Sequence, residues 1–213
     1  MYIPPHFSEA RPEVLKEFIE KNPFGVLITN GASGLDANHI PFEIQAGGDH
    51  GKLTAHVARN NPVWQDVKNG DEVLVVFSAG DSYISPSWYP SKHEFHKQVP
   101  SWNYMVVHAR GRIAIHDDER YVRGVVARLT RTHEGQMEKP WKMTDSPADY
   151  IDMMLKAIVG FEIELTSLAG KFKLSQNKEV RDIRSAGEAL TARGETTIGH
   201  AMLRAAEEKE KSS

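Results

Sequence analysis

The sequence contains no cysteine, and this absence removes several classes of function at once. None of its 213 residues can form a disulfide, ligate a metal as a thiolate or act as a thiol nucleophile. The glycine-rich phosphate loops G-x-G-x-x-G and G-x-x-x-x-G-K-[ST] are also missing. If this protein binds a phosphate group, we therefore expect side chains to hold it.

The sequence also lacks a large excess of either charge and any long apolar run. Its 26 basic and 29 acidic residues give a formal net charge of −3, so no general attraction to nucleic acid or to an anionic membrane is expected. No run of about eighteen apolar residues occurs, and no basic segment followed by an apolar one opens the chain. We expect a soluble cytoplasmic protein without a membrane partner.

Ten histidines are present, but their spacing does not predict a metal site. His93 and His96 lack the H-E-x-x-H spacing that places two imidazoles on one helical face. No serine lies in a G-x-S-x-G turn, so a serine hydrolase is not indicated. The sequence therefore predicts no metal, and the catalytic residues stay unknown.

Hydrophobic periodicity predicts a mainly β (α+β) chain with peripheral helices. Strand patterns occupy residues 24–30, 35–44, 52–57, 72–78, 103–116 and 160–175. Helical patterns occupy residues 11–21, the segment opened by Asp117 and Asp118, residues 146–158 with Ser146 as a cap, and two stretches after residue 178. Turn signals between the strands favour a mostly antiparallel sheet or barrel.

Residues 81–104 read DSYISPSWYPSKHEFHKQVPSWNY and combine aromatic rings with prolines. Proline is disfavoured inside a strand, and a solvated linker rarely carries so many aromatic rings. We interpret this segment as a loop whose rings pack against a flat molecule.

Two segments offer donors for a phosphate and a planar ring. Arg59 follows a predicted strand and precedes a helical turn, which suits an anion, although an ordinary surface arginine at a strand end explains the spacing as well. The segment GKFKLSQN, residues 170–177, supplies two lysines and three neutral polar side chains that suit the edge of a heterocycle. A strand end followed by a helix cap is the alternative.

The order of several unusual words resembles the PaiB family, the FMN-binding split-barrel proteins described as negative transcriptional regulators. These words include ANHIPF at 37–42, HVARNNPVW at 56–64, YISPSWYPSK at 83–92, PSWNY at 100–104, LTRTHE at 129–134 and GKFKLSQN at 170–177. The resemblance implies a six-stranded split β-barrel. From the sequence pattern we assign residues 1–177, with their inserted helices, to this FMN-binding domain and residues 178–213 to a C-terminal helical extension packed on it. The resemblance also implies a homodimer that binds FMN in clefts between the two chains.

Carried over by position, the resemblance assigns an FMN site. Arg59 would hold the phosphate with Thr54 and His56 nearby, and Asn38 and His39 would border the ring. Trp102 and Asn103 would reach the cleft, and the segment of Lys171, Lys173, Ser175, Gln176 and Asn177 would close it near the isoalloxazine edge.

Two functions stay open at this stage. One is an FMN-binding regulator whose flavin acts as a ligand or redox sensor, and the other is a flavin-dependent oxidoreductase with an unknown small-molecule substrate. DNA binding has weak support, because the one helix pair that resembles a helix-turn-helix, near 178–208, carries glutamates through its second half. Arg120, Arg123, Arg128 and Arg131 form the other candidate basic face, for which simple solvation is the alternative.

Overall fold

The computed structural model describes residues 1–212, which divide into two compact units. Unit 1 comprises Met1–Phe18, Ser78–His108 and the segment from Ala169 to the end of the described residues. Unit 2 comprises Ile19–Phe77 and Ala109–Leu168. The boundary between a domain at 1–177 and a helical extension stays a prediction.

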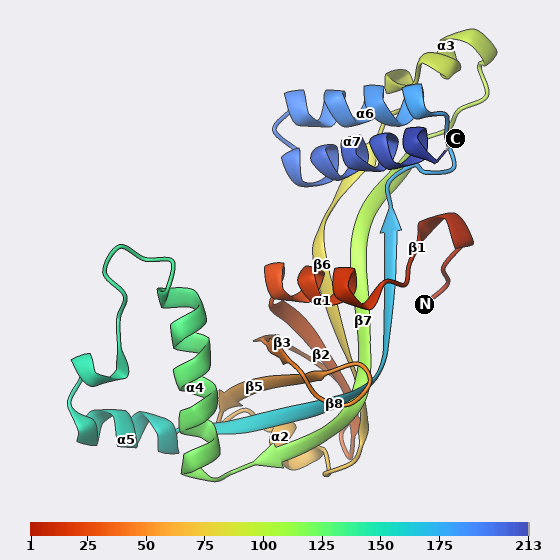
Figure 1. Ribbon diagram of the computed structural model, residues 1–213. Coiled ribbons are helices and arrows are strands. Elements are labelled where there is room, and N and C mark those ends of the chain that lie inside the picture. The colour runs from red at the N-terminus through yellow and green to blue at the C-terminus, as the bar shows by residue number, and fades with distance from the viewer. Residues whose placement is uncertain (213) are drawn as a thin grey trace. The chain divides into compact units, whose positions relative to one another are not determined.

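The described residues contain one eight-stranded sheet, which is not closed into a barrel (Figure 1). Its strand order is β3-β2-β6-β7-β8-β5-β4, with β1 paired to β8. Three long strands, β6, β7 and β8, each contribute residues to both units. The strands are β1 (Ser8–Glu9), β2 (Phe24–Gly31), β3 (Gly34–Pro41), β4 (Glu43–Gln45), β5 (Lys52–Ala58), β6 (Glu72–Ile84), β7 (Ser101–His116) and β8 (Ile158–Lys173).

Helices flank the sheet strands in both units. Short 3-10 turns lie at Pro5–Phe7, Pro86–Trp88 and Met143–Asp145. The α-helices are α1 (Pro12–Lys21), α2 (Val63–Asp66), α3 (Pro90–Phe95), α4 (Glu119–Glu134), α5 (Ala148–Lys156), α6 (Val180–Ala192) and α7 (Thr196–Lys211). The mainly β fold with peripheral helices is therefore confirmed, although the described strands number eight and not the expected six.

The core of unit 2 is built from strands whose apolar side chains point to one face. Leu53, Ala55 and Val57 of β5 are buried, and the residues between them lie on the other face of the strand. β5 pairs antiparallel with β8, so that Ala55 lies opposite Phe161 and His56 lies opposite Gly160. The other face of β5 carries two of the candidate residues, Thr54 and His56.

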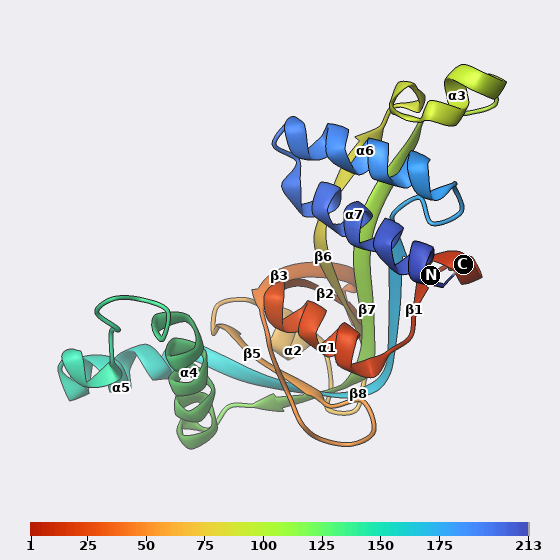
Figure 2. The same cartoon turned by 45° about the horizontal axis from the view of Figure 1, so that its top comes forward.

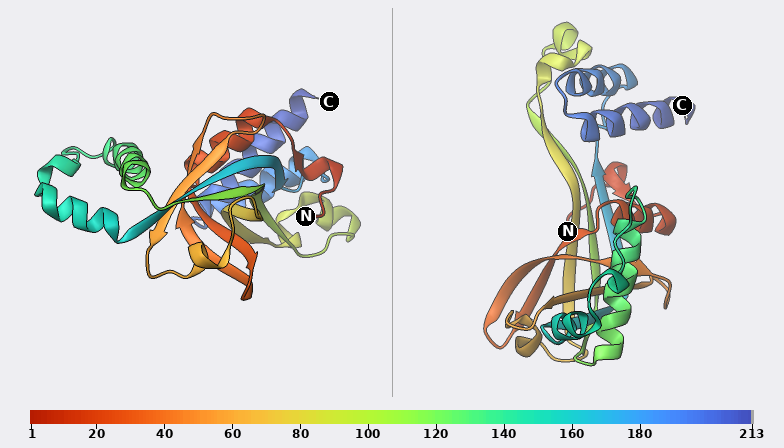
Figure 3. Two further views of the ribbon diagram at one scale, coloured as in Figure 1. Left: turned by 90° about the horizontal axis from the view of Figure 1, so that it is seen from below. Right: turned by 90° about the vertical axis from the view of Figure 1, so that its left-hand side faces the viewer.

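Helices α4 and α5 are neighbouring helices of unit 2, joined by residues 135–147 (Figure 3). The Asp118 side chain accepts a hydrogen bond of 2.8 Å from the Tyr121 amide and begins α4, as the sequence predicted. The prediction for Ser146 was wrong. α5 begins after Pro147, which occupies the cap position in an extended conformation and has no side-chain acceptor, so Ser146 lies one residue too early.

Helices α6 and α7 pack closely against each other within unit 1 (Figure 2). A Cβ atom at Gly199 would lie 2.5 Å from Thr191 Oγ1 and 3.0 Å from the Gly187 carbonyl oxygen, so only glycine allows this approach. The two helices expected after residue 178 are confirmed, and they lie side by side.

Residues 81–104 are only partly a loop. β6 continues to Ile84 with Ser82 and Ile84 buried and Asp81 and Tyr83 exposed, and β7 already begins at Ser101. The expectation of a loop over the whole segment was therefore wrong, because the alternation of buried side chains persists at both ends. The prolines lie between the strands: Pro86 begins a 3-10 turn, Pro90 begins α3, and Pro100 directly precedes β7.

Candidate functional site

The predicted FMN residues fall in both units. Unit 2 holds Asn38, His39, Thr54, His56 and Arg59, and unit 1 holds Trp102, Asn103, Lys171, Lys173, Ser175, Gln176 and Asn177. Several residues of each group form hydrogen bonds within their own unit, and these bonds are described below residue by residue.

The Arg59 guanidinium is engaged by several partners within unit 2. It donates to both carboxylate oxygens of Asp117, which precedes α4, and its Nε donates to the Lys156 carbonyl oxygen at 2.7 Å. A further, longer bond of 3.3 Å reaches the Ile158 carbonyl oxygen. This guanidinium lowers the pKa of the Asp117 carboxyl, mainly through their hydrogen bonds. Arg59 thus connects the end of β5 to the start of α4 and of β8.

Thr54 is covered by the α4 side of unit 2. Its side chain is 1% exposed, and its hydroxyl donates to Glu43 Oε2 at 3.3 Å. Arg128 of α4 donates to the same carboxylate oxygen at 2.9 Å. Thr54 therefore belongs to a polar contact between β4, β5 and α4.

Asn38 and His39 lie on β3. The Asn38 amide donates to Asp36 and accepts a hydrogen bond of 2.7 Å from Asn61 Nδ2. The His39 ring lies 6.3 Å from the Phe24 ring, centroid to centroid. These contacts tie β3 to its own strand partner and to the segment after β5.

The structure adds two aromatic residues to the surroundings of His56. The Tyr121 ring lies over Gly160, where an added Cβ would come within 2.9 Å of it, and the His116 ring stacks on Tyr121 at 3.8 Å. His56 Nδ1 and His116 Nε2 are buried without a hydrogen-bond partner, and burial lowers the pKa of His56. The sequence signal for this cluster was a glycine inside a strand, which marks a close approach.

Asn103 and Ser175 form a buried polar connection inside unit 1. Asn103 is 1% exposed, and its Nδ2 donates to Ser175 Oγ at 2.9 Å and contacts Met202 Sδ at 3.2 Å. The Tyr89 hydroxyl bonds the same Ser175 oxygen at 2.9 Å. Ser175 has a φ of 65°, a left-handed conformation that these bonds help to hold. Both side chains are therefore structural in this unit.

Gln176 closes a local turn, and Asn177 is exposed. The Gln176 side chain accepts from the Leu174 amide at 2.7 Å and donates to the Phe172 carbonyl oxygen at 2.6 Å. Gln176 thus ends β8 through its own backbone, while Asn177 lies on the surface after it.

Sequence reasoning missed Asp182, a buried carboxylate of α6. It is 1% exposed and accepts hydrogen bonds from the Ser91 amide at 3.0 Å and the Ser91 hydroxyl at 2.6 Å. These two bonds connect α3 to α6. No sequence pattern pointed to a pair so distant along the chain.

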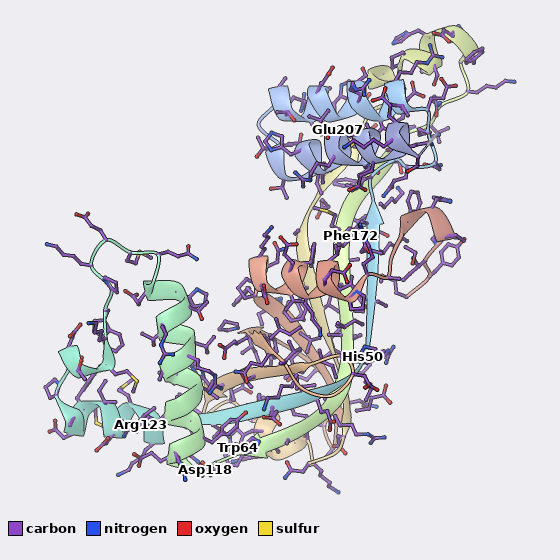
Figure 4. The ribbon with its side chains drawn as sticks, in the orientation of Figure 1. His50, Trp64, Asp118, Arg123, Phe172 and Glu207 are labelled. Carbon is purple, nitrogen blue, oxygen red and sulfur yellow. The ribbon has the colours of Figure 1, made fainter. Side chains whose placement is uncertain are left out.

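Lys171 and Lys173 lie on a face of unit 1 that differs from the buried network. Asn103 and Phe172 point toward α7 and α1, since Asn103 contacts Met202 and Phe172 lies 5.2 Å from the Phe18 ring. Alternate strand residues point to opposite faces, so Trp102, Tyr104 and both lysines point the other way. Figure 4 labels Phe172 on β8. We name this surface the lysine–aromatic face; it comprises Tyr83, Trp102, Tyr104, Lys171 and Lys173.

The lysine–aromatic face combines exposed rings with positive charge. Trp102 is 55% and Tyr83 45% exposed, and their ring centroids lie 5.9 Å apart in an edge-to-face arrangement. Lys171 Nζ lies 5.3 Å from the Tyr104 ring centroid. Among the ion pairs of residues 1–212, none includes Lys171 or Lys173. A ring contact and a cation without a carboxylate partner suit a planar anionic ligand.

Comparison with known proteins defines the class. The model of the family described as "Putative FMN-binding domain" matches residues 1–167, and the chain belongs to this family. FMN, the cofactor that the resemblance implied, is thereby confirmed at the level of the family.

The PaiB-type relationship is also confirmed. The chain is 30% identical over 190 residues to protease synthase and sporulation protein PAI 2 of Bacillus subtilis, covering 89% of both chains.

Solved structures share the fold at low sequence identity. A conserved hypothetical protein, Rv2991 of Mycobacterium tuberculosis, aligns with a TM-score of 0.56 and 13% identity over 81% of this chain and 90% of that chain. The flavocytochrome Anf3 of Azotobacter vinelandii aligns with a TM-score of 0.54 and 12% identity over 78% and 69% of the two chains.

Two features are absent from the described residues 1–212. No helix there is long and apolar enough to cross a membrane, and no three His, Asp or Glu side chains lie close enough together to hold a metal ion. The homodimer and the cytoplasmic location stay predictions.

Proposed function

We propose that the protein binds FMN as a redox group and exchanges electrons with a small-molecule partner. The observation that carries this proposal is the lysine–aromatic face, which offers exposed rings and two cations without carboxylate partners. When bound, FMN supplies one- and two-electron transfer. The chain's own residues would then bind and orient it, Trp102 through ring contact and the lysines through charge.

The candidate basic face of α4 favours this proposal over DNA binding. Arg123 pairs with Glu119 at 2.8 Å and with Asp152 of α5 at 2.5 Å. Arg128 pairs with Glu43. Figure 4 labels Arg123 on α4. Arginines whose charges are already matched contribute little to the release of counterions from DNA.

A regulator with flavin as a ligand or redox sensor is the second candidate. The name of the B. subtilis relative, which refers to protease synthesis and sporulation, favours it. Under this proposal FMN would change the affinity of the protein for DNA, and Arg120 and Arg131 would be the cations of α4 that the described ion pairs leave available.

A spectrum of the purified protein, with mass identification of the compound released on denaturation, tests FMN binding. We expect FMN, reduction by dithionite and reoxidation by a small-molecule acceptor. Weak, poorly selective oxidation of NADH and NADPH is expected, because no glycine-rich dinucleotide loop holds them. Salt-sensitive binding to duplex DNA without electron transfer to any acceptor would favour the regulator.

A further inference from the structure

We infer that a cavity between β6 and the start of α7 binds a small free α-amino acid in its zwitterionic form. The cavity has a volume of about 220 Å³, and all the residues that line it belong to unit 1. β6 contributes residues 79–82, and the α6–α7 turn with the first turn of α7 contributes residues 194–198. None of these residues belongs to the predicted FMN site, so the inference goes beyond the proposed function.

The first argument concerns the backbone donors at the start of α7. The first amides of a helix have no acceptor within it. The described hydrogen bonds include none from the amides of Thr196, Thr197 and Ile198, and Glu195 before them provides no side-chain cap. Free amides at the positive end of a 16-residue helix suit the carboxylate of a ligand.

The second argument is a buried hydroxyl without a partner. Ser82 lines the cavity and is only 4% exposed, and within residues 1–212 its hydroxyl forms no hydrogen bond. A buried polar group is costly unless a molecule beside it completes its hydrogen bonds. The Ser82 hydroxyl therefore marks a place in the cavity wall that suits a polar atom of a ligand.

The third argument is charge of the opposite sign. Asp81 and Glu195 line the same cavity. No ion pair of the described residues includes Asp81, and Glu195 makes one long contact of 3.5 Å between its Oε1 atom and Arg193 Nε. Two acidic residues disfavour a simple anion, and the positive end of α7 disfavours a simple cation. A ligand that carries an ammonium beside a carboxylate matches both kinds of group.

The size of the cavity limits the ligand to a small molecule. About 220 Å³ corresponds to about seven water molecules at about 30 Å³ each. A free amino acid with a small side chain fits this space, whereas pockets for drug-sized ligands begin at about 300 Å³. Ala79 and Ile198 supply apolar atoms for such a side chain.

Stabilisation of α7 is the competing explanation for the two acidic residues. Carboxylates near the first turn of a helix stabilise it without any ligand. This explanation does not account for the unpartnered Ser82 hydroxyl. It also predicts that neutralising Asp81 and Glu195 changes stability alone, so binding measurements separate the two explanations.

The test compares L-alanine with three matched compounds by isothermal titration calorimetry of the purified full chain. Propionate lacks the ammonium, L-alaninamide lacks the carboxylate, and glycerol is a neutral polyol of similar size. We expect L-alanine to bind with a Kd below about 1 mM and each of the other compounds to bind at least about tenfold more weakly.

Variants separate the charges from the hydroxyl and from the fold. Asp81→Asn/Glu195→Gln removes both charges; it should weaken L-alanine binding at least about tenfold and leave propionate binding unchanged or stronger. Ser82→Ala should weaken L-alanine binding by about three- to tenfold without lowering Tm. Glu207→Gln, at an exposed position of α7 outside the cavity, is the control and should change neither quantity.

Three results would overturn the inference. Wild type would give no saturable heat with L-alanine; any of the other three compounds would bind as tightly as L-alanine; or the double acidic variant would keep full affinity for L-alanine, whatever its Tm. Loss of L-alanine binding in that variant, with propionate binding retained, supports the inference and cannot result from general unfolding. Binding of FMN is measured separately, and its failure would leave this result unchanged.

Discussion

Two cations on the strands of unit 2 pair with carboxylates, whereas two lysines on a strand of unit 1 contact aromatic rings or neutral oxygens. Lys52 of β5 pairs with Glu162 at 2.8 Å, and Arg110 of β7 pairs with Glu72 at 3.3 Å. In unit 1, Lys171 lies over Tyr104, and Lys173 donates only to neutral oxygens. Charges in unit 2 thus connect elements, and the two lysines of unit 1 remain available to a ligand.

The difference teaches that residue type alone does not show whether a side chain already has partners. Arg59 was predicted to hold the phosphate because arginine suits phosphate geometry, and its donors are directed at Asp117 and the Lys156 carbonyl oxygen. Its contact with FMN stays a prediction. The candidate residues of unit 1 also differ in exposure, since Asn103 and Ser175 are buried and bonded to each other while Trp102 is exposed. Exposure and the presence of a partner therefore distinguish side chains that hold the fold from side chains that a ligand can reach.

The largest loss of stability is expected from a substitution at Gly111, where β7 packs closely on β8 in unit 2. A Cβ there would lie 2.4 Å from the Glu164 carbonyl oxygen and 2.6 Å from Ile163 Cγ2. Gly111→Ala should therefore lower the free energy of unfolding by about 3–4 kcal/mol, as overpacking against backbone does. Urea unfolding measures the change.

Gly124→Ala is the matched control for Gly111→Ala. Gly124 lies inside α4, and an added Cβ would meet only Arg128 Nη1 at 3.5 Å. The same substitution should there be neutral or stabilising by up to about 1 kcal/mol, because alanine favours a helix. Equal destabilisation at both glycines would contradict the packing of β7 on β8.

The second largest loss of stability is expected where the buried Asp182 carboxylate of unit 1 accepts hydrogen bonds from Ser91. Asp182→Ala leaves the Ser91 amide and hydroxyl without their acceptor and should cost about 2–3 kcal/mol in the free energy of unfolding. Glu207→Gln, at an exposed position of α7 labelled in Figure 4, is the control and should change stability little. An Asp182 variant as stable as wild type would show that α3 does not depend on this carboxylate.

Strands with clear alternation were predictable from the sequence, and so was α4 with its Asp118 cap. The path of residues 81–84 was readable from the same alternation, but the prolines and rings that follow obscured it. Gly160 was a usable signal that went unread: a glycine between Val159 and Phe161 in a buried strand left space for the Tyr121 ring.

Long-range partners were not predictable. Asp182 and Ser91 are 91 residues apart, and Arg59 and Asp117 are 58 residues apart. Spacing rules describe neighbours within one helix or strand, and they carry no information on which distant side chain completes a charge pair. Sequence analysis therefore selected residue types suited to FMN and could not tell the engaged ones from the available ones.

The third effect concerns pH and the buried imidazole of unit 2. Burial lowers the pKa of His56, so the folded state favours its neutral form. The unfolded state has the higher pKa, about 6.5, and takes up a proton first as the pH falls. Stability from this group is complete above about pH 6.5 and declines below it, by at most about 1.4 kcal/mol per pH unit.

Urea unfolding at pH 8 and pH 5.5 measures this decline. His56→Gln keeps a polar side chain without a proton to gain, so its stability should fall less between the two pH values than that of wild type. A parallel decline in both proteins would show that other groups account for the pH dependence.

The smallest effect compares the two kinds of cation directly. Arg59→Gln removes the ion pair with Asp117 and the bonds to two carbonyl oxygens, but the pair is partly exposed and screened by water, so Tm should fall by no more than about 2–4 °C. Lys171→Gln removes no ion pair and relieves repulsion with Lys173, so its Tm should stay the same or rise slightly. Raising the salt concentration should narrow the gap between the variants, because salt screens both the attraction at Arg59 and the repulsion at Lys171. A Tm lowered more by Lys171→Gln than by Arg59→Gln would reverse the assignment of structural and available cations to the two units.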